Sequence, residues 1–91
     1  MGEDIFDNEE FRALPQAEQL RLYVEEGRPV NHFLTFLIQN DLMRCVGRAD
    51  PVNLAALEVY CIWLQSYAPP MCYGSKANMD AWIAHRGLRG I

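Results

Sequence analysis

The 91-residue sequence lacks the residue patterns that most often reveal a protein's chemistry. It contains two histidines and three cysteines, and they form neither a CxxC nor an HExxH motif. It also contains no GxSxG motif and no glycine-rich loop of the kind that binds phosphate. Because no catalytic constellation is visible, we expect a protein that is not an enzyme and that uses no cofactor or metal ion.

Long apolar runs and a secretion signal are also missing. No run approaches the roughly 18 apolar residues that a membrane-spanning helix requires, and the N-terminus does not show the basic and then apolar order of a signal peptide. Three cysteines cannot all pair within one chain, and Cys45 and Cys61 fall in apolar helical segments. These features predict reduced thiols and a cytoplasmic location.

The sequence has no excess of basic residues, since its net charge is −4. Binding to nucleic acid of any sequence depends on Lys and Arg facing phosphates, so this class of function is disfavoured. The acids are concentrated in residues 1–26, which carry eight acids and two arginines, whereas residues 27–91 carry four acids and six bases. Such an acidic segment either solubilises the chain or meets a basic surface of a partner.

What the sequence does contain is helical patterning over one domain, residues 1–91. Apolar residues recur at spacings of three and four, which predicts an all-α bundle of about five helices. Residues 33–38 are apolar enough for a strand, but the Asn40-Asp41 pair that follows can end one helix and begin the next, which favours a helix. We expect residues 1–6 to be flexible and residues 88–91 to form a tail.

The strongest helix start is Asp50-Pro51, an N-cap followed by proline at the first helical position. The helix is expected to continue to about Tyr67, ahead of Pro69-Pro70, and its interior is apolar almost all round. A helix of this kind is normally surrounded. We therefore expect residues 51–67 to form the centre of the bundle, or to be covered partly by a second copy in a homodimer, which could also form through residues 33–38.

Aromatic residues recur along one side of this helix, at Tyr60, Trp63 and Tyr67. They can belong to the core or to a binding face, because Tyr and Trp are enriched at interface hot spots. Prolines in the segment 68–74 hold a turn that could expose Met71 and Tyr73. Together with the acidic segment, this patch gives the candidate partner-binding residues Asp7, Glu9, Glu10, Glu25, Glu26, Tyr67, Met71 and Tyr73.

Two other functions remain open from the residues alone. A DNA-binding helix-turn-helix could use residues 30–39 with 41–48, or 41–48 with 51–66, but the first arrangement offers only Arg44 and Arg48 for DNA contacts. A small enzyme or metal-binding protein could use Cys72, which is expected in a loop and exposed, together with His85.

Several motifs together resemble a known group of proteins. They are GRPVNHFLTFLIQNDLMRCVGRAD at residues 27–50, NL at 53–54, WL at 63–64, APPMCYGS at 68–75 and Trp82. The chain is similar over residues 20–83 to short accessory proteins, about 90 residues long, that phages and prophages encode and whose activities are uncharacterised. The resemblance supplies no catalytic residues and does not extend to residues 1–14. It implies a cytoplasmic setting in a host cell and binding to a host protein, such as a defence or regulatory factor, which is inhibited or modulated.

Overall fold

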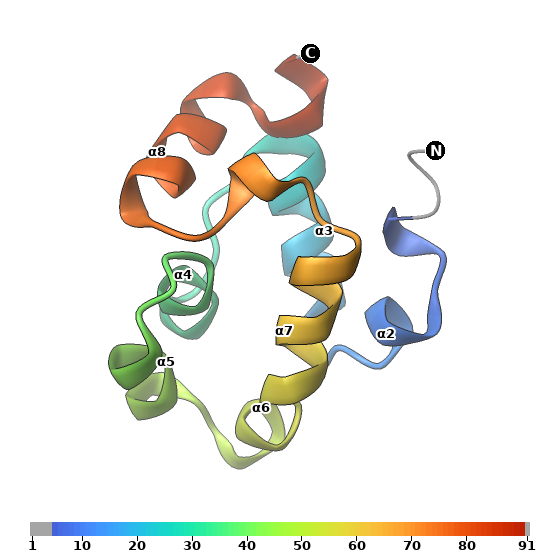
Figure 1. Cartoon of the computed structure of the whole chain (residues 1–91), viewed down its shortest axis with the longest axis vertical. Helices are drawn as coiled ribbons and strands as arrows, with labels where there is room; N and C mark the ends of the chain where they lie inside the picture. The colour runs from blue at the N-terminus through green and yellow to red at the C-terminus, as the bar shows by residue number, and fades with distance from the viewer. Residues whose placement is uncertain (1–4, 91) are drawn as a thin grey trace.

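Helices are the regular elements of residues 5–90, the part of the chain that the computed structural model describes (Figure 1). Five helices have seven residues or more, so the predicted all-α fold is confirmed within this range. None of the described helices is both long enough and apolar enough to cross a bilayer. In chain order the elements are α2 (Glu9–Arg12), α3 (Ala17–Glu26), α4 (His32–Ile38), α5 (Leu42–Arg48), α6 (Pro51–Ala55), α7 (Leu57–Ser66), η1 (Pro70–Cys72), α8 (Lys76–His85) and η2 (Gly87–Gly90).

Side-chain caps fix several of the helix starts. Asp50 accepts a hydrogen bond from the backbone N–H of Asn53 at 2.8 Å, which confirms the predicted start of α6. At α2 the N-cap is Asn8, whose side chain accepts a hydrogen bond from the backbone N–H of Phe11 at 2.7 Å. Helix α3 begins at Ala17, two residues after Pro15, and its N-cap residue Gln16 makes no side-chain capping hydrogen bond.

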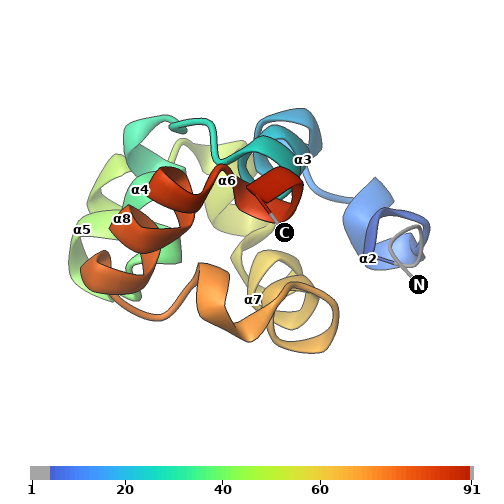
Figure 2. The same cartoon turned by 90° about the horizontal axis from the view of Figure 1, so that it is seen from above.

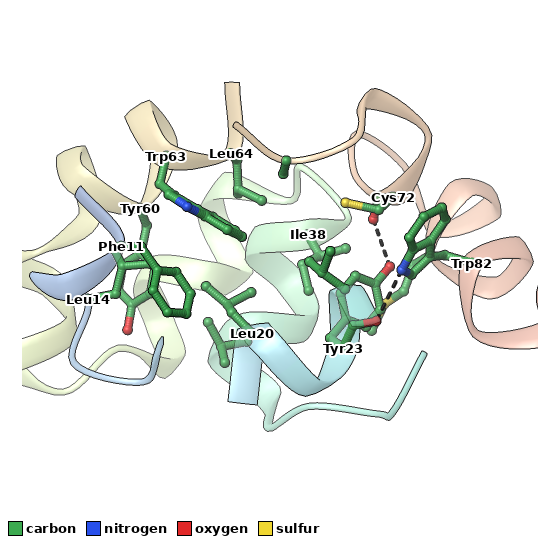
Figure 3. Packing of buried hydrophobic residues seen from close by; sticks show 14 of the residues in the cluster. Phe11, Leu14, Leu20, Tyr23, Ile38, Tyr60, Trp63, Leu64, Cys72 and Trp82 are labelled. Atoms are coloured by element: carbon green, nitrogen blue, oxygen red, sulfur yellow. Dashed lines mark hydrogen bonds between the residues drawn. The ribbon is translucent and has the colours of Figure 1, made fainter. Parts of the chain in front are cut away.

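The core is arranged around α3, whose Leu20, Tyr23 and Val24 have no exposed surface (Figure 3). The Tyr23 hydroxyl donates a hydrogen bond to the backbone carbonyl of Cys72 at 2.7 Å. The backbone carbonyl of Tyr23 accepts from the indole N–H of Trp82 at 3.0 Å. One residue of α3 thus connects this helix to both η1 and α8, as the dashed lines in Figure 3 show.

The predicted continuous helix over residues 51–67 is wrong in detail, because it is divided into α6 and α7 at Ala56. Ala56 has φ −95° and ψ 5°, which is outside the helical region, although neither proline nor glycine marks the position. The contact across the break is polar, since the Tyr60 hydroxyl donates to the buried side chain of Asn53 at 2.8 Å. Tyr60 and Trp63 belong to the core, whereas Val52 and Leu54 of α6 are exposed.

The two ends of the described chain are packed rather than loose. Ile5 and Phe6, expected to be flexible, lie partly buried against the core, and the Trp63 indole N–H donates to the carbonyl of Ile5 at 2.8 Å. The expected flexibility of residues 1–4 lies outside the described residues. Residues 88–90 are not a loose tail either, because they belong to η2, which packs against α3 with Leu88 partly buried.

Close approach of two backbones explains the packing of η2. Gly87 has a φ of 62°, and a Cβ placed on it would lie 2.6 Å from the carbonyl oxygen of Val24. A side chain would therefore clash with α3 and strain the backbone, so glycine is what permits this contact.

The Tyr60 hydroxyl gives a first prediction, because it also accepts a hydrogen bond from the backbone N–H of Gln16 at 3.1 Å. Tyr60→Phe should lower the free energy of unfolding by about 1–3 kcal/mol, since it leaves two polar groups without this partner. Urea denaturation followed by circular dichroism measures the change. Tyr67→Phe, on a side chain at the surface, is the matched control and should leave stability unchanged. Equal stability of the two variants would contradict the role given to this hydroxyl.

Buried protonated groups give a second prediction, on stability at alkaline pH. Burial raises the pKa of Cys72 from 9.0 to about 12 and that of Tyr60 from 10.0 to about 12, because it penalises the charged forms. The unfolded chain releases these protons at the ordinary values, so the stabilisation is complete below about pH 9 and is lost as the pH rises towards 12. The urea midpoint should therefore fall from about pH 9 to about pH 11.

Cys72→Ala tests the contribution of the thiol to this pH dependence. The variant should be less stable at neutral pH, because it leaves a small cavity. It should also lose less stability than the wild type between about pH 9 and about pH 11. An unchanged slope in that range would show that the thiol of Cys72 does not contribute.

Candidate functional site

Helices α5 and α6 lie at one end of the molecule (Figure 1), and most of the large exposed apolar side chains belong to them. Of the eight large exposed hydrophobic residues in the described range, five lie within residues 42–54. Met43 is the most exposed of them, at 84%. We refer to this set as the α5–α6 surface, which consists of Leu42, Met43, Val46, Val52 and Leu54.

The local sequence explains why α5 leaves so much apolar surface in solvent. The helix has seven residues, and of these only Cys45 is buried. It packs against α4 on one side, but its apolar residues are too many for that single face. The apolar side chains left over therefore have no covering element within residues 5–90.

An apolar groove of about 220 Å³ lies beside this surface, between α4–α5 and α7. Leu42 of the α5–α6 surface lines the groove and connects the two features. The residues that line it are Phe36, Leu37, Asn40, Asp41, Leu42, Cys45, Leu57, Cys61, Leu64, Gln65, Tyr73 and Gly74.

A second, more polar hollow adjoins the groove and is lined by Phe36, Arg44, Gly47 and Arg48. The guanidinium of Arg44 lies 5.9 Å from the centre of the Phe36 ring and 3.7 Å from the Asp41 carboxylate. Arg48 has no ion pair or hydrogen bond from its side chain among the described residues. Since Phe36 lines both hollows, the hollow that contains the two arginines shares one wall with the apolar groove.

The predicted acidic surface is divided between two places. Asp7, Glu9 and Glu10 lie at α2, while Glu25 and Glu26 lie at the C-terminal end of α3, and Figure 1 shows these places well apart. Several of these carboxylates also have partners within the chain, which reduces the charge available to another protein.

Three of the five carboxylates, those of Asp7, Glu25 and Glu26, form ion pairs within the described residues. Asp7 is 2.9 Å from Arg12, and Glu25 pairs with Arg21. Glu26 contacts both Arg28, at 2.8 Å, and Arg89, at 3.0 Å. Glu9 is exposed and has no ion pair within the described range, so it is the most available of the predicted acids.

The predicted aromatic patch is only partly assembled. Met71 is 62% exposed and Tyr67 is 36% exposed, as the prediction required. Tyr73, however, is partly buried against the core and lines the apolar groove, which Tyr67 and Met71 do not. The partner-binding role of these three residues stays a prediction.

The thiol that the sequence places in an exposed loop is in fact buried. Cys72 has no exposed surface, and its backbone carbonyl accepts a hydrogen bond from Tyr23 of α3. Burial raises the pKa of its thiol, which disfavours the nucleophilic thiolate. His85 stacks on Trp82, with ring centres 6.1 Å apart, and its Nδ1 lies 3.0 Å from the carbonyl oxygen of Gly87. Within residues 5–90 no group of three metal-ligating side chains is assembled.

The helix-turn-helix alternative requires a recognition helix with a polar exposed face, but the exposed face of α5 is largely apolar. Residues 30–39 and 41–48 do form packed neighbouring helices, α4 and α5. A helix that reads DNA presents several polar side chains to the groove. Around Arg44 and Arg48, α5 instead exposes Leu42, Met43 and Val46, which offer no hydrogen bonds to base edges.

Sequence reasoning missed the α5–α6 surface because it treated the apolar residues of α5 and α6 as core. One signal could have found it. The segment LMRCVGR has four apolar residues and two arginines in two turns, with glycine weakening the helix. So short a helix can bury one face only, and the remaining apolar side chains then have to lie in solvent.

The groove predicts a difference in reactivity among the three thiols. Cys61 is partly exposed in the groove, whereas Cys45 and Cys72 are buried. A disulfide reagent should therefore modify one thiol in the folded protein and three in urea. Because burial raises the pKa of Cys61, the rate should keep rising with pH above the ordinary thiol range. Cys61→Ser should abolish the reaction of the folded protein, and continued modification of that variant would contradict the assignment.

Comparison with known proteins identifies no relative of this chain. No model of a protein family matches the chain, and no curated protein and no solved structure matches it.

Proposed function

We propose that this chain acts by binding another protein, and that the contact is made through the α5–α6 surface and the adjoining groove. The observation that carries the proposal is the concentration of five large exposed apolar side chains within residues 42–54. Exposed apolar residues are common singly, whereas a group of them beside a hollow is typical of a protein interface.

The residue types on this surface support the same function. Methionine is enriched at protein interfaces and adapts its shape to a partner, and Met43 is at the most exposed position of the surface. Arginine is also enriched in interfaces, and Arg44 and Arg48 flank the apolar side chains. Burial of apolar area contributes about 25 cal/mol per Å², so covering this surface would favour association.

The resemblance to short phage and prophage proteins supports a partner among the proteins of a bacterial host. In that setting we propose that binding inhibits or modulates the host protein, for example a defence or regulatory factor. A second copy of the chain is another possible occupant of the surface, and the mass in solution distinguishes the two.

Two methionines test the location of the contact. Met43→Glu places a charge on the α5–α6 surface, and Met71→Glu places the same charge on the patch predicted from the sequence. Both side chains are exposed, so neither change should affect folding. The tagged wild type and both variants are incubated with host lysate, and retained proteins are quantified by mass spectrometry. We expect a host protein whose recovery falls about ten-fold or more with Met43→Glu and is unchanged with Met71→Glu.

Two controls complete the experiment. Thermal unfolding of both variants checks that the fold is intact, and light scattering reports the mass of the wild type. Loss of the partner with Met71→Glu alone would place the contact at the aromatic patch. Loss only after charge reversal of Glu9 and Glu10 would place it at α2. Either result would refute the α5–α6 surface as the site of binding.

A further inference from the structure

We infer that the partner presents an amphipathic helix with acidic flanks, which inserts apolar side chains into the groove between α4–α5 and α7 and directs carboxylates to Arg44 and Arg48. This inference rests on the proposed function and specifies the chemistry of the partner.

The size of the groove favours a side chain over a cofactor. Its volume of about 220 Å³ is below the roughly 300–1,000 Å³ that is usual for small-molecule sites. A hollow of this size suits one or two anchoring side chains, and hot-spot residues of interfaces typically fill pockets of this kind. Phe36, Leu57 and Leu64 give the groove apolar walls, so the anchors are expected to be apolar as well.

The helical form of the partner follows from what the groove can recognise. Between residues 5 and 90 the chain has no sheet edge to which an extended peptide could add a strand. A groove between helices instead accepts one face of another helix, with anchors at positions i, i+3, i+4 and i+7. The exposed side chain of Leu42 lines the groove, and Met43, the next residue of α5, is exposed and available to extend this apolar contact.

The charge at the groove's edge gives the preference for acidic flanks. Residues 41–48 contain Asp41, Arg44 and Arg48, a net charge of +1 in a chain whose net charge is −4. Asp41 engages Arg44 only loosely, at 3.7 Å, and the nearby Asp50 is occupied in capping α6. The guanidinium of Arg48 therefore faces solvent without a partner among the described residues. Arginine pairs carboxylates in a bidentate manner, which gives specificity as well as attraction.

The acidic helix α2 of the same molecule does not supply this contact. Figure 2 shows α2 and α5 on opposite sides of the molecule. Phe11 of α2 is held against Trp63, with ring centres 5.3 Å apart, so the helix is already docked elsewhere. Helix α2 of the same molecule therefore does not pair with Arg44 and Arg48, and we infer that the carboxylates come from a partner.

Two designed peptides test the inference on the full-length chain. Each is a helix of about 18 residues, long enough to be helical alone, with leucines at i, i+3, i+4 and i+7. One carries glutamates beside the leucines, and the other carries lysines at the same positions. Fluorescence anisotropy should show the glutamate peptide binding about five- to ten-fold more tightly at low salt, with the ratio falling as salt is added.

The arginines and the groove are then separated by substitution. Arg44→Ala with Arg48→Ala should bring the ratio of the two affinities close to one, while apolar binding persists. Leu42→Asp should weaken both peptides, because it places a charge at the groove. Protection of Cys61 from a disulfide reagent gives an independent readout, since that thiol lines the groove. Arg86→Ala, at the C-cap of α8 and outside the lining of both hollows, is the matched control and should change neither affinity.

Three results would overturn the inference. The first is equal or tighter binding of the lysine peptide by the wild type. The second is a preference for glutamate that survives removal of both arginines. The third is salt-sensitive binding of a DNA duplex that requires the two arginines, with no binding of the glutamate peptide. The proposed function is tested by a different experiment, and it fails if the Met43→Glu variant still retains the host protein from lysate. Failure of the inference and failure of the proposed function can therefore be distinguished.

Discussion

The structure depends on the burial of one tyrosine. Tyr23 lies in the core without exposed surface, and two hydrogen bonds join it to chain segments about fifty or more residues away. A buried hydroxyl or indole N–H without a partner costs free energy, so the Tyr23 hydroxyl needs the Cys72 carbonyl of η1 and the Trp82 indole of α8 needs the Tyr23 carbonyl. These two bonds fix the C-terminal third of the chain on α3, and the apolar packing of the core follows this arrangement.

The distribution of buried side chains shows which helices remain at the periphery. The core is filled by side chains of α3, α4, α7 and α8, together with Phe11 and Leu14. Helices α5 and α6 each bury only one residue, Cys45 and Asn53, and so contribute little to the core. Their exposed apolar side chains consequently remain in solvent, where they do not contribute hydrophobic free energy to the folding of a monomer. This is the physical basis for assigning the binding surface to α5 and α6.

Local signals predicted the helix ends well where a cap or a left-handed residue is involved. Asn40 adopts a positive φ angle where α4 was expected to end, and Asp50 caps α6 as predicted. The break at Ala56 could not be predicted, because alanine favours helix and no breaker is nearby. The burial of Cys72 could not be predicted from the neighbouring sequence either, since it depends on contact with Tyr23, which is far away in the sequence.

The sequence by itself determined the all-α class and the absence of recognisable catalytic motifs, because these depend on periodicity and on short motifs. Only the tertiary structure decided which apolar side chains are covered. Leu42, Met43 and Val46 look like core residues in the sequence, since each fits a helical apolar pattern. Burial is a property of the neighbours that a side chain meets, and those neighbours come from segments whose positions local patterns do not specify.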